Sequence, residues 1–250
     1  MGYVTKTLVR RCDPWQVAAA AAGPEAGAPE RPLWMPNCRR LVVVVAHPHE
    51  ELCAAGGLLH HLVLHGVPVS VLVITDSGAS YLDASYHALG LSGIRRYRLG
   101  LARGYVEAGE HDVTAAVSEL VGFGDPRGLW CLAPWELDGH PDHDAAGRAT
   151  SAACSAYRLP LLRYPIAAAD RIRVSAPAKQ QVHQLALTAP VRQRKRRALI
   201  RLRVGGLTGD IEQVAPTEVF VGDLAPEDGS SRGAGSRRPA ATTPCWEGEI

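Results

Sequence analysis

The chain has 250 residues, of which 46% are hydrophobic and 21% are charged, and its formal net charge at pH 7 is +2. This length suits one α/β domain with a buried core, and so small a net charge gives no overall attraction to nucleic acid or anionic lipid. No apolar run approaches the roughly 20 residues of a membrane span. The six cysteines are scattered without a Cys-x-x-Cys pair, which argues against a thiolate zinc site and favours reduced thiols in the cytoplasm.

Short apolar runs alternate with amphipathic segments through most of the chain. Residues 1–34 are rich in Ala, Pro and Gly and are interpreted as an N-terminal arm. "LVVVVA" at 41–46 is apolar on both faces, as a central parallel strand requires. A helix over 50–65 and a strand over 66–75 follow, and the Gly/Ser/Tyr-rich stretch over 76–93 predicts a loop.

The alternation continues in the second half of the chain. Strands are predicted over 94–101, 128–135, 159–166 and 217–224, and helices over 111–123, 142–157 and about 190–203. Strand and helix in regular turn indicate a Rossmann-like α/β domain over 35–224, a mostly parallel sheet with helices on both faces. Residues 225–250 hold little that could be buried and are predicted to form a disordered tail.

Two polar clusters follow strands of this predicted sheet. The first is His47-Pro48-His49-Glu50-Glu51, directly after the four-valine run, and the second is His140-Pro141-Asp142-His143, after "LWCLAP". Ligands of such sheets bind outside the carboxyl ends of the strands, so we expect the two clusters to face each other across one cleft. Imidazole and carboxylate groups gathered there indicate a metal ion or a proton transfer.

These stretches carry a family resemblance. "AHPHEELCAAGG" (46–57) resembles the "AHPDDE…GG" signature of the PIG-L/LmbE-like deacetylases, and "DGHPDHDAAG" (138–147) is similar to their "GHPDH" signature. "VLVITDSGAS" (71–80) is similar to their "TDGEAS" segment, and the resemblance covers about residues 32–224. Family members are zinc-dependent hydrolases of a linear amide bond. They remove N-acetyl groups from amino sugars on lipids, thiols or antibiotic precursors.

The resemblance implies a role for each matched residue. His47 and His143 would be zinc ligands, and Glu50 stands where the family has its ligand aspartate. His140 would stabilise the tetrahedral oxyanion, and Asp142 would orient a neighbouring imidazole through a hydrogen bond. The implied substrate is a small N-acetylated amino sugar or glycoconjugate. Gly56 and Gly57 would let the first helix pack closely against the sheet.

His49 departs from the family pattern, because it stands at the position of the aspartate that acts as general base. A neutral imidazole can accept a proton near pH 7. If His49 instead binds the metal, the open coordination position closes. "YPIAAADRI" (164–172) also stands where family members carry an aromatic-His segment. Two functions stay open: an N-deacetylase, or a catalytically impaired metal-binding homologue that recognises a glycan or a partner.

Two further histidine- or arginine-rich stretches are interpreted as surface features. "VRQRKRRALIRLRV" (191–204) predicts an amphipathic helix with solvated arginines and with Ala198, Leu199 and Leu202 facing inward, since a basic helix without interleaved aromatics is weak support for nucleic-acid binding. The histidines of "HHLVLHG" do not share one helix face, so we expect exposed helix histidines rather than a second metal site.

Overall fold

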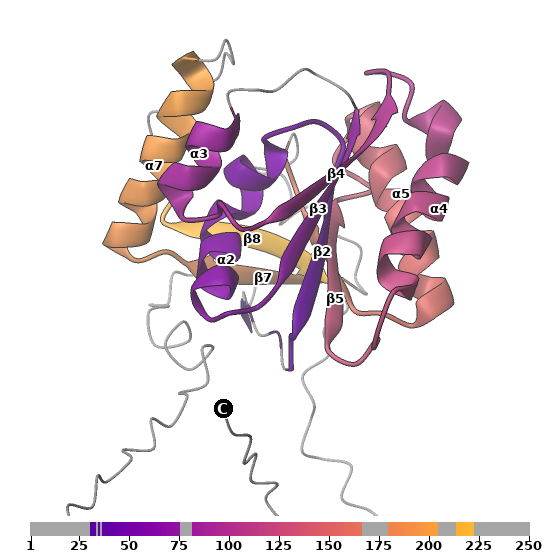
Figure 1. The fold of residues 1–250 in the computed structure, drawn as a ribbon, viewed down its shortest axis with the longest axis horizontal. Coiled ribbons are helices and arrows are strands. Elements are labelled where there is room, and N and C mark those ends of the chain that lie inside the picture. Colours follow the sequence, from indigo (N-terminus) through magenta and orange to yellow (C-terminus); the bar gives the residue numbers. More distant parts are fainter. Residues whose placement is uncertain are drawn as a thin grey trace, which may run out of the picture.

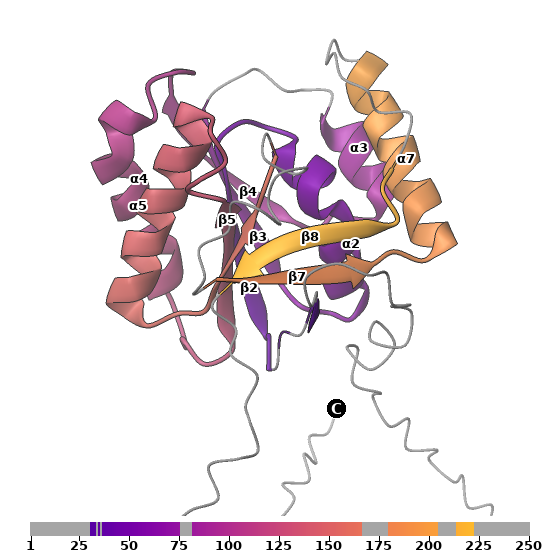
Figure 2. The same ribbon diagram turned by 180° about the vertical axis from the view of Figure 1, so that it is seen from behind.

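An eight-stranded sheet organises the protein, whose computed structural model describes residues 31–33, 35, 37–75, 82–166, 180–204 and 214–222. The strand order is β1-β7-β8-β6-β5-β2-β3-β4, and every neighbouring pair is parallel except that β8 runs antiparallel to β6 and β7 (Figures 1 and 2). The strands are β1 (Arg31–Pro32), β2 (Arg40–Val45), β3 (Val69–Thr75), β4 (Arg95–Leu101), β5 (Leu129–Pro134), β6 (Leu161–Tyr164), β7 (Gln181–Ala186) and β8 (Thr217–Gly222). The predicted mostly parallel sheet is confirmed.

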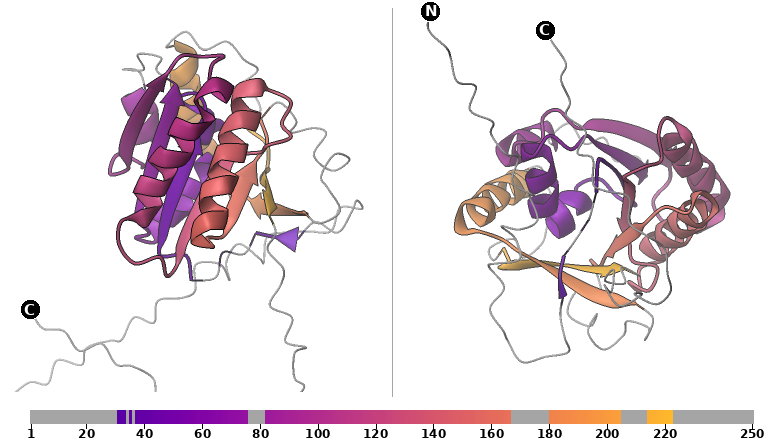
Figure 3. Two further views of the ribbon diagram at one scale, coloured as in Figure 1. Left: turned by 90° about the vertical axis from the view of Figure 1, so that its right-hand side faces the viewer. Right: turned by 90° about the horizontal axis from the view of Figure 1, so that it is seen from below.

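Helices cover both faces of this sheet. One layer holds α2 (Glu50–Leu64), α3 (Leu82–Leu89) and α7 (Ala189–Val204), and the other holds the short η1 (Glu107–Gly109), α4 (Glu110–Gly122) and α5 (Pro141–Tyr157). Helices α4 and α5 pack side by side in front of the strands in the left view of Figure 3, and α3 packs along α7 (Figure 1). The expected Rossmann-like architecture is therefore present.

Strand β2 is buried on both of its faces. Leu41, Val43 and Val45 belong to the apolar core shared with α2, α3 and α7, whereas Val42 and Val44 belong to the core under α4 and α5. Side chains of a strand alternate between the two faces, so a four-valine run suits a position between two helical layers. The prediction of a central parallel strand is confirmed.

The chain changes direction across the sheet between β2 and β5. From β2 the chain runs through α2 to the neighbouring β3, while from β5 it runs through α5 to β6 on the opposite side. Helices α2 and α5 therefore leave adjacent strands toward opposite faces. Their starts diverge at the carboxyl edge of the sheet, and this switch point is where open α/β sheets bind ligands.

The predicted loop over 76–93 is wrong for residues 82–89, which form α3. Leu82, Tyr86 and Leu89, at spacings of four and three residues, are buried in the core, and Gly90 with a φ of +77° follows the helix. Packing against α7 stabilises this helix although its composition is typical of a loop. Strand β7 was not predicted either, because its alternating residues "QVHQLA" carry little apolar signal.

The paired glycines allow β8 and α7 to approach α2. A Cβ atom on Gly57 would lie 2.3 Å from Cδ2 of Leu187 and 3.0 Å from Oε1 of Glu218. The buried Glu218 carboxylate accepts hydrogen bonds from the backbone N–H groups of Gly57 (2.6 Å) and Leu58 (2.8 Å), and Lys195 donates to it at 2.6 Å. The close packing expected of this glycine pair is confirmed.

Helix α7 presents its arginines to solvent. Arg192, Arg194 and Arg201 are exposed, as are the adjacent pair at 196–197, whereas Ala198, Leu199 and Leu202 are buried as predicted. None of the helices in the described ranges combines the length and the apolar character that crossing a membrane demands. The predicted tail and all of the predicted arm except residues 31–33 lie outside the described residues.

Candidate metal centre

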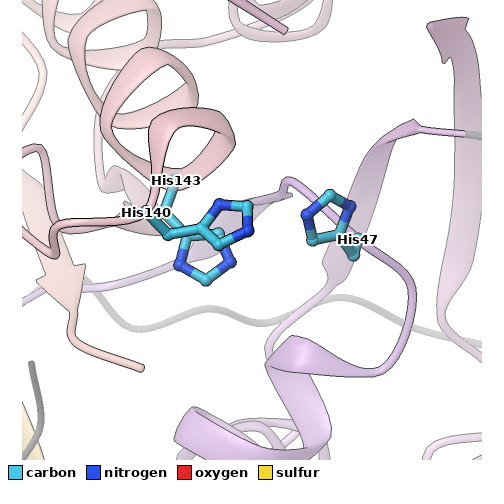
Figure 4. Close-up of side chains that lie close together, drawn as sticks. All are labelled: His47, His140 and His143. Carbon is cyan, nitrogen blue, oxygen red and sulfur yellow. The ribbon is translucent and has the colours of Figure 1, made fainter. Parts of the chain in front are cut away.

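Three histidines meet at the switch point between β2 and β5. His47 lies in the connection from β2 to α2, whereas His140 caps the start of α5 and His143 lies in its first turn (Figure 4). The ring centroid of His47 is 5.4 Å from that of His140 and 5.7 Å from that of His143, and the latter two rings stack at 4.3 Å. One nitrogen from each lies within 4.8 Å of the others, a spacing that could hold a metal ion. The expectation that the two clusters face each other is confirmed.

Thr75 determines which nitrogen of His47 carries its proton. The hydroxyl of Thr75, at the end of β3, donates to the carbonyl of Ala46 at 2.8 Å, so it can only accept at 3.0 Å from Nδ1 of His47. Burial lowers the pKa of His47 to about 4, against the charge of Glu50, and keeps the imidazole neutral. Its Nε2 atom therefore presents a lone pair toward the site.

That lone pair faces a carboxylate. Nε2 of His47 is buried without a hydrogen-bond partner and lies 3.3 Å from Oδ2 of Asp142. Asp142 also accepts hydrogen bonds from the backbone N–H groups of Gly104 (2.8 Å) and Val106 (3.2 Å), so its position is held by the connection after β4. Two acceptor atoms facing each other in a buried site are stabilised by a cation between or beside them.

His143 lies between two buried carboxylates. Its Nδ1 is 2.5 Å from Oδ2 of Asp138, and its Nε2 is 2.8 Å from Oε1 of Glu50. Burial lowers the pKa of His143, but the hydrogen bonds and charges of Asp138 and Glu50 outweigh it and raise the pKa to about 9. Without a metal, both nitrogens therefore hold protons, and a metal ion would replace the proton that Nε2 shares with Glu50.

Glu50 folds back over the start of its own helix. Its Oε2 accepts from the backbone N–H of His47 at 3.1 Å, which aims Oε1 at His143. Glu50 as a whole residue is 5% exposed. The extra methylene, relative to an aspartate at this position, is thereby accommodated without moving the carboxylate away from the histidines.

His140 differs from the other two histidines in its hydrogen bonding. Its Nδ1 accepts from the backbone N–H of Asp142 at 3.2 Å, which caps α5. In the neutral ring the proton then lies on Nε2, so that this atom is a donor. A donor beside His47 and His143 suits the stabilisation of a developing oxyanion better than it suits metal binding.

His49 has a backbone conformation that side chains rarely adopt. Its φ is 85° and its ψ is −15°, the left-handed region, at the N-cap of α2. Such conformations cost about 1–2 kcal/mol and concentrate at functional sites. Its Nδ1 is buried without a hydrogen-bond partner, and burial lowers the pKa of the ring below its ordinary value, against the charge of Glu50. His49 is a neutral imidazole with an unused ring nitrogen.

Two residues of the site received no role from the sequence. Thr75 and Asp138 hold the Nδ1 atoms of His47 and His143, respectively, while Asp142 lies against Nε2 of His47. Thr75 and Asp138 belong to stretches that resemble the family segments, at 71–80 and 138–147. This resemblance was the sequence feature that could have pointed to them. Residues 76–80 of the "TDSGAS" segment and residues 167–172 of "YPIAAADRI" lie outside the described residues.

Solved structures with the same fold include deacetylases. The zinc-inhibited form of teicoplanin deacetylase Orf2 matches with a TM-score of 0.53 at 14% identity over 73% of this chain and 97% of its own. N,N'-diacetylchitobiose deacetylase from Pyrococcus horikoshii matches with a TM-score of 0.52 at 16% identity over 75% of this chain and 86% of its own. The fold thus agrees with the resemblance in the motifs. No family model matches the sequence, and no curated protein is significantly similar to it.

The same fold also carries a different reaction. GalB, the 4-carboxy-2-hydroxymuconate hydratase of Pseudomonas putida KT2440, matches with a TM-score of 0.52 at 12% identity over 81% of this chain and 100% of its own. Fold alone therefore does not decide the chemistry, which has to be argued from the residues of the site.

Proposed function

We propose that this protein is a zinc-dependent N-deacetylase that hydrolyses the N-acetyl group of an amino sugar or glycoconjugate. The observation that carries the proposal is the buried, unprotonated Nε2 of His47 beside the pair formed by His143 and Glu50. An unpartnered buried acceptor is costly unless a ligand satisfies it. The deacetylases that share the fold support this choice of reaction.

The ligands in this proposal are Nε2 of His47, Nε2 of His143 and Oε1 of Glu50. Two imidazoles and one carboxylate with an open position are a usual ligand set of catalytic zinc. The alternative set replaces Glu50 by His140, whose nitrogens lie close enough. We favour Glu50 because its Oε1 already lies 2.8 Å from His143, whereas Nδ1 of His140 is engaged with the backbone of Asp142. When bound, zinc would polarise the acyl carbonyl and lower the pKa of water.

His49 and His140 would supply the remaining chemistry. His49, neutral and with Nδ1 unused, accepts the proton of the attacking water and returns it to the leaving amine. His140 donates from Nε2 to the oxygen that becomes negative in the tetrahedral state. Asp138 and Thr75 keep the two metal-binding imidazoles in orientation by holding their Nδ1 atoms. The free cysteines of the described part of the chain support a reducing, cytoplasmic location.

The experiment is release of free amine from a panel of N-acetylated sugars by zinc-loaded protein. The panel contains N-acetylglucosamine, its alkyl glycosides, its phosphates and diacetylchitobiose. We expect activity to disappear with chelator and to return with zinc, and His143→Asn to stay inactive after zinc is added. Stoichiometric zinc without amine release from any sugar would contradict the hydrolase and favour the non-catalytic glycan- or partner-binding homologue.

A further inference from the structure

A tight turn brings the backbone of residue 103 close to the candidate metal centre. The backbone N–H of Tyr105 donates to the carbonyl of Ala102 at 3.2 Å, and Gly104 has a φ of +79°, as the third position of a type II turn requires. This turn begins directly after β4, at the carboxyl edge of the sheet, where the switch point also lies. Arg103 occupies its second position.

The carboxylate of Asp142 connects this turn to His47. It accepts from the backbone N–H groups of Gly104 (2.8 Å) and Val106 (3.2 Å), on either side of Tyr105. The same carboxylate lies 3.3 Å from Nε2 of His47. The backbone that carries Arg103 is therefore hydrogen-bonded to a side chain that lies against His47, so the turn holds the root of the Arg103 side chain near the histidines.

Arg103 carries an exposed charge. The residue is exposed, and it forms no ion pair with any carboxylate in the part of the chain that the structure describes. Arg148, on the neighbouring helix, is by contrast paired with Glu110. After burial and Glu50, the next influence on the pKa of both His47 and His49 is the charge of Arg103, which lowers it. The charge of Arg103, which no described carboxylate pairs, thus lies within electrostatic range of both histidines of the first motif.

We propose that Arg103 recognises an anionic group, phosphate or carboxylate, on the substrate. The substrate class is then an N-acetylated amino sugar that carries such a group within reach of its acetamido group. A guanidinium binds phosphate and carboxylate through paired N–H donors, which also fixes the orientation of the sugar. Tyr105, at the fourth position of the same turn, is 67% exposed and offers an aromatic ring to a ligand. This inference rests on the proposed function for the reaction, but not for the binding of the anion.

The test compares three probes on three variants. The probes are N-acetylglucosamine, N-acetylglucosamine 1-phosphate and N-acetylmuramic acid, which are neutral, phosphorylated and carboxylated. The variants are Arg103→Ala, Arg103→Lys and the control Arg95→Ala. Arg95 is exposed at the first position of β4, so its removal takes away the same charge at the opposite edge of the sheet.

We expect zinc-loaded wild-type protein to prefer at least one anionic probe by roughly 10–100-fold in kcat/KM, through KM. Arg103→Ala should abolish this preference, Arg103→Lys should retain part of it, and Arg95→Ala should leave it unchanged. The anionic probe with the higher kcat/KM shows whether the site prefers a phosphate or a carboxylate. Equal kcat/KM for all probes, or an unchanged preference in Arg103→Ala, would overturn the proposal.

Calorimetric binding of the same probes separates this inference from the proposed function. Binding of an anionic probe that depends on Arg103, without amine release, would retain the anion site and reject the hydrolase. Amine release from the neutral sugar without any effect of Arg103 would retain the hydrolase and reject the anion site. Neither binding nor turnover of the anionic probes would also reject the anion site.

Discussion

A hydrogen bond from Nδ1 of His47 to the hydroxyl of Thr75 leaves the buried Nε2 of His47 without a proton. Thr75 donates to the carbonyl of Ala46 at 2.8 Å and accepts from Nδ1 of His47 at 3.0 Å. The tautomer of His47 is therefore determined by a hydroxyl 28 residues away in sequence. We therefore expect the affinity of the site for a metal ion to depend on this contact.

Replacing Thr75 by Val removes the hydroxyl and keeps the shape of the side chain. Without its acceptor, Nδ1 of His47 loses the proton preference that keeps Nε2 free. We expect zinc affinity to fall about 10–100-fold. Competition with a chromophoric chelator measures this, and Thr75→Ser, which keeps the hydroxyl, is the control. Equal zinc affinity in the Val and Ser variants would show that the hydrogen bond from His47 to Thr75 does not control metal binding.

Substitutions of Glu50 and His140 distinguish the two ligand sets. Glu50→Gln should lower the zinc content well below one ion per chain, because a neutral amide replaces the carboxylate beside His143. His140→Asn should keep the metal and the helix cap, since Asn is a good N-cap, but should lower turnover about 10²–10³-fold. Elemental analysis after gel filtration measures the metal. Zinc loss in His140→Asn with zinc retained in Glu50→Gln would favour the three-histidine site.

His49 is best tested with side chains that tolerate its left-handed backbone. Asn and Asp adopt that conformation readily, so His49→Asn removes the base without adding strain. We expect its turnover to fall about 10²–10⁴-fold with zinc content unchanged, and His49→Asp to retain activity. Burial lowers the pKa of His49 from 6.5, so the acid limb of the wild-type profile should lie below that value. A His49→Asn variant that loses zinc would identify His49 as a ligand that blocks the site.

Glu51 makes the metal-free protein less stable as the pH rises. Its carboxyl is 1% exposed, with Oε1 accepting from Tyr86 at 2.6 Å and Oε2 unpartnered, and burial raises its pKa from 4.5 to about 7. A raised folded-state pKa contributes stability that is complete below pH 4.5 and is lost as the pH passes 7.

Glu51→Gln mimics the protonated carboxyl at every pH. Relative to wild type, we expect this variant to gain on the order of 3 kcal/mol between pH 4.5 and pH 8. Urea unfolding in the presence of chelator measures the difference. A constant difference across this range would show that Glu51 does not titrate there.

Gly57 lies where α2 leaves little room for a side chain. An added Cβ would lie 2.3 Å from Leu187 and would crowd the carboxylate of Glu218. We expect Gly57→Ala to destabilise the protein by about 1–3 kcal/mol despite the better helix propensity of Ala. Gly93→Ala is the matched control, because nothing lies within 4 Å of its added Cβ. Equal midpoints in urea for both variants would contradict this close packing.

The order of most strands and helices, and the place in the chain of the candidate site, could be predicted from the amino-acid sequence. A run such as "LVVVVA" is compatible with few environments other than a strand between two helical layers. Polar residues directly after parallel strands must then lie at one edge of the sheet. His47 and His143 could be brought together on this ground alone, because the periodicity of side chains and the direction of parallel strands are local properties.

The protonation states of these residues, in contrast, follow from contacts that exist only in the folded chain. Helix α3 forms because α7 packs against it, and strand β7 forms because β1 and β8 pair with it, which their own composition does not indicate. The proton on His47 is positioned by Thr75, and the charge of His143 is set by Asp138 and Glu50. Protonation in a buried site depends on the donors and acceptors within about 3 Å. Those partners come from separate strands and helices, and the folded chain alone assembles them.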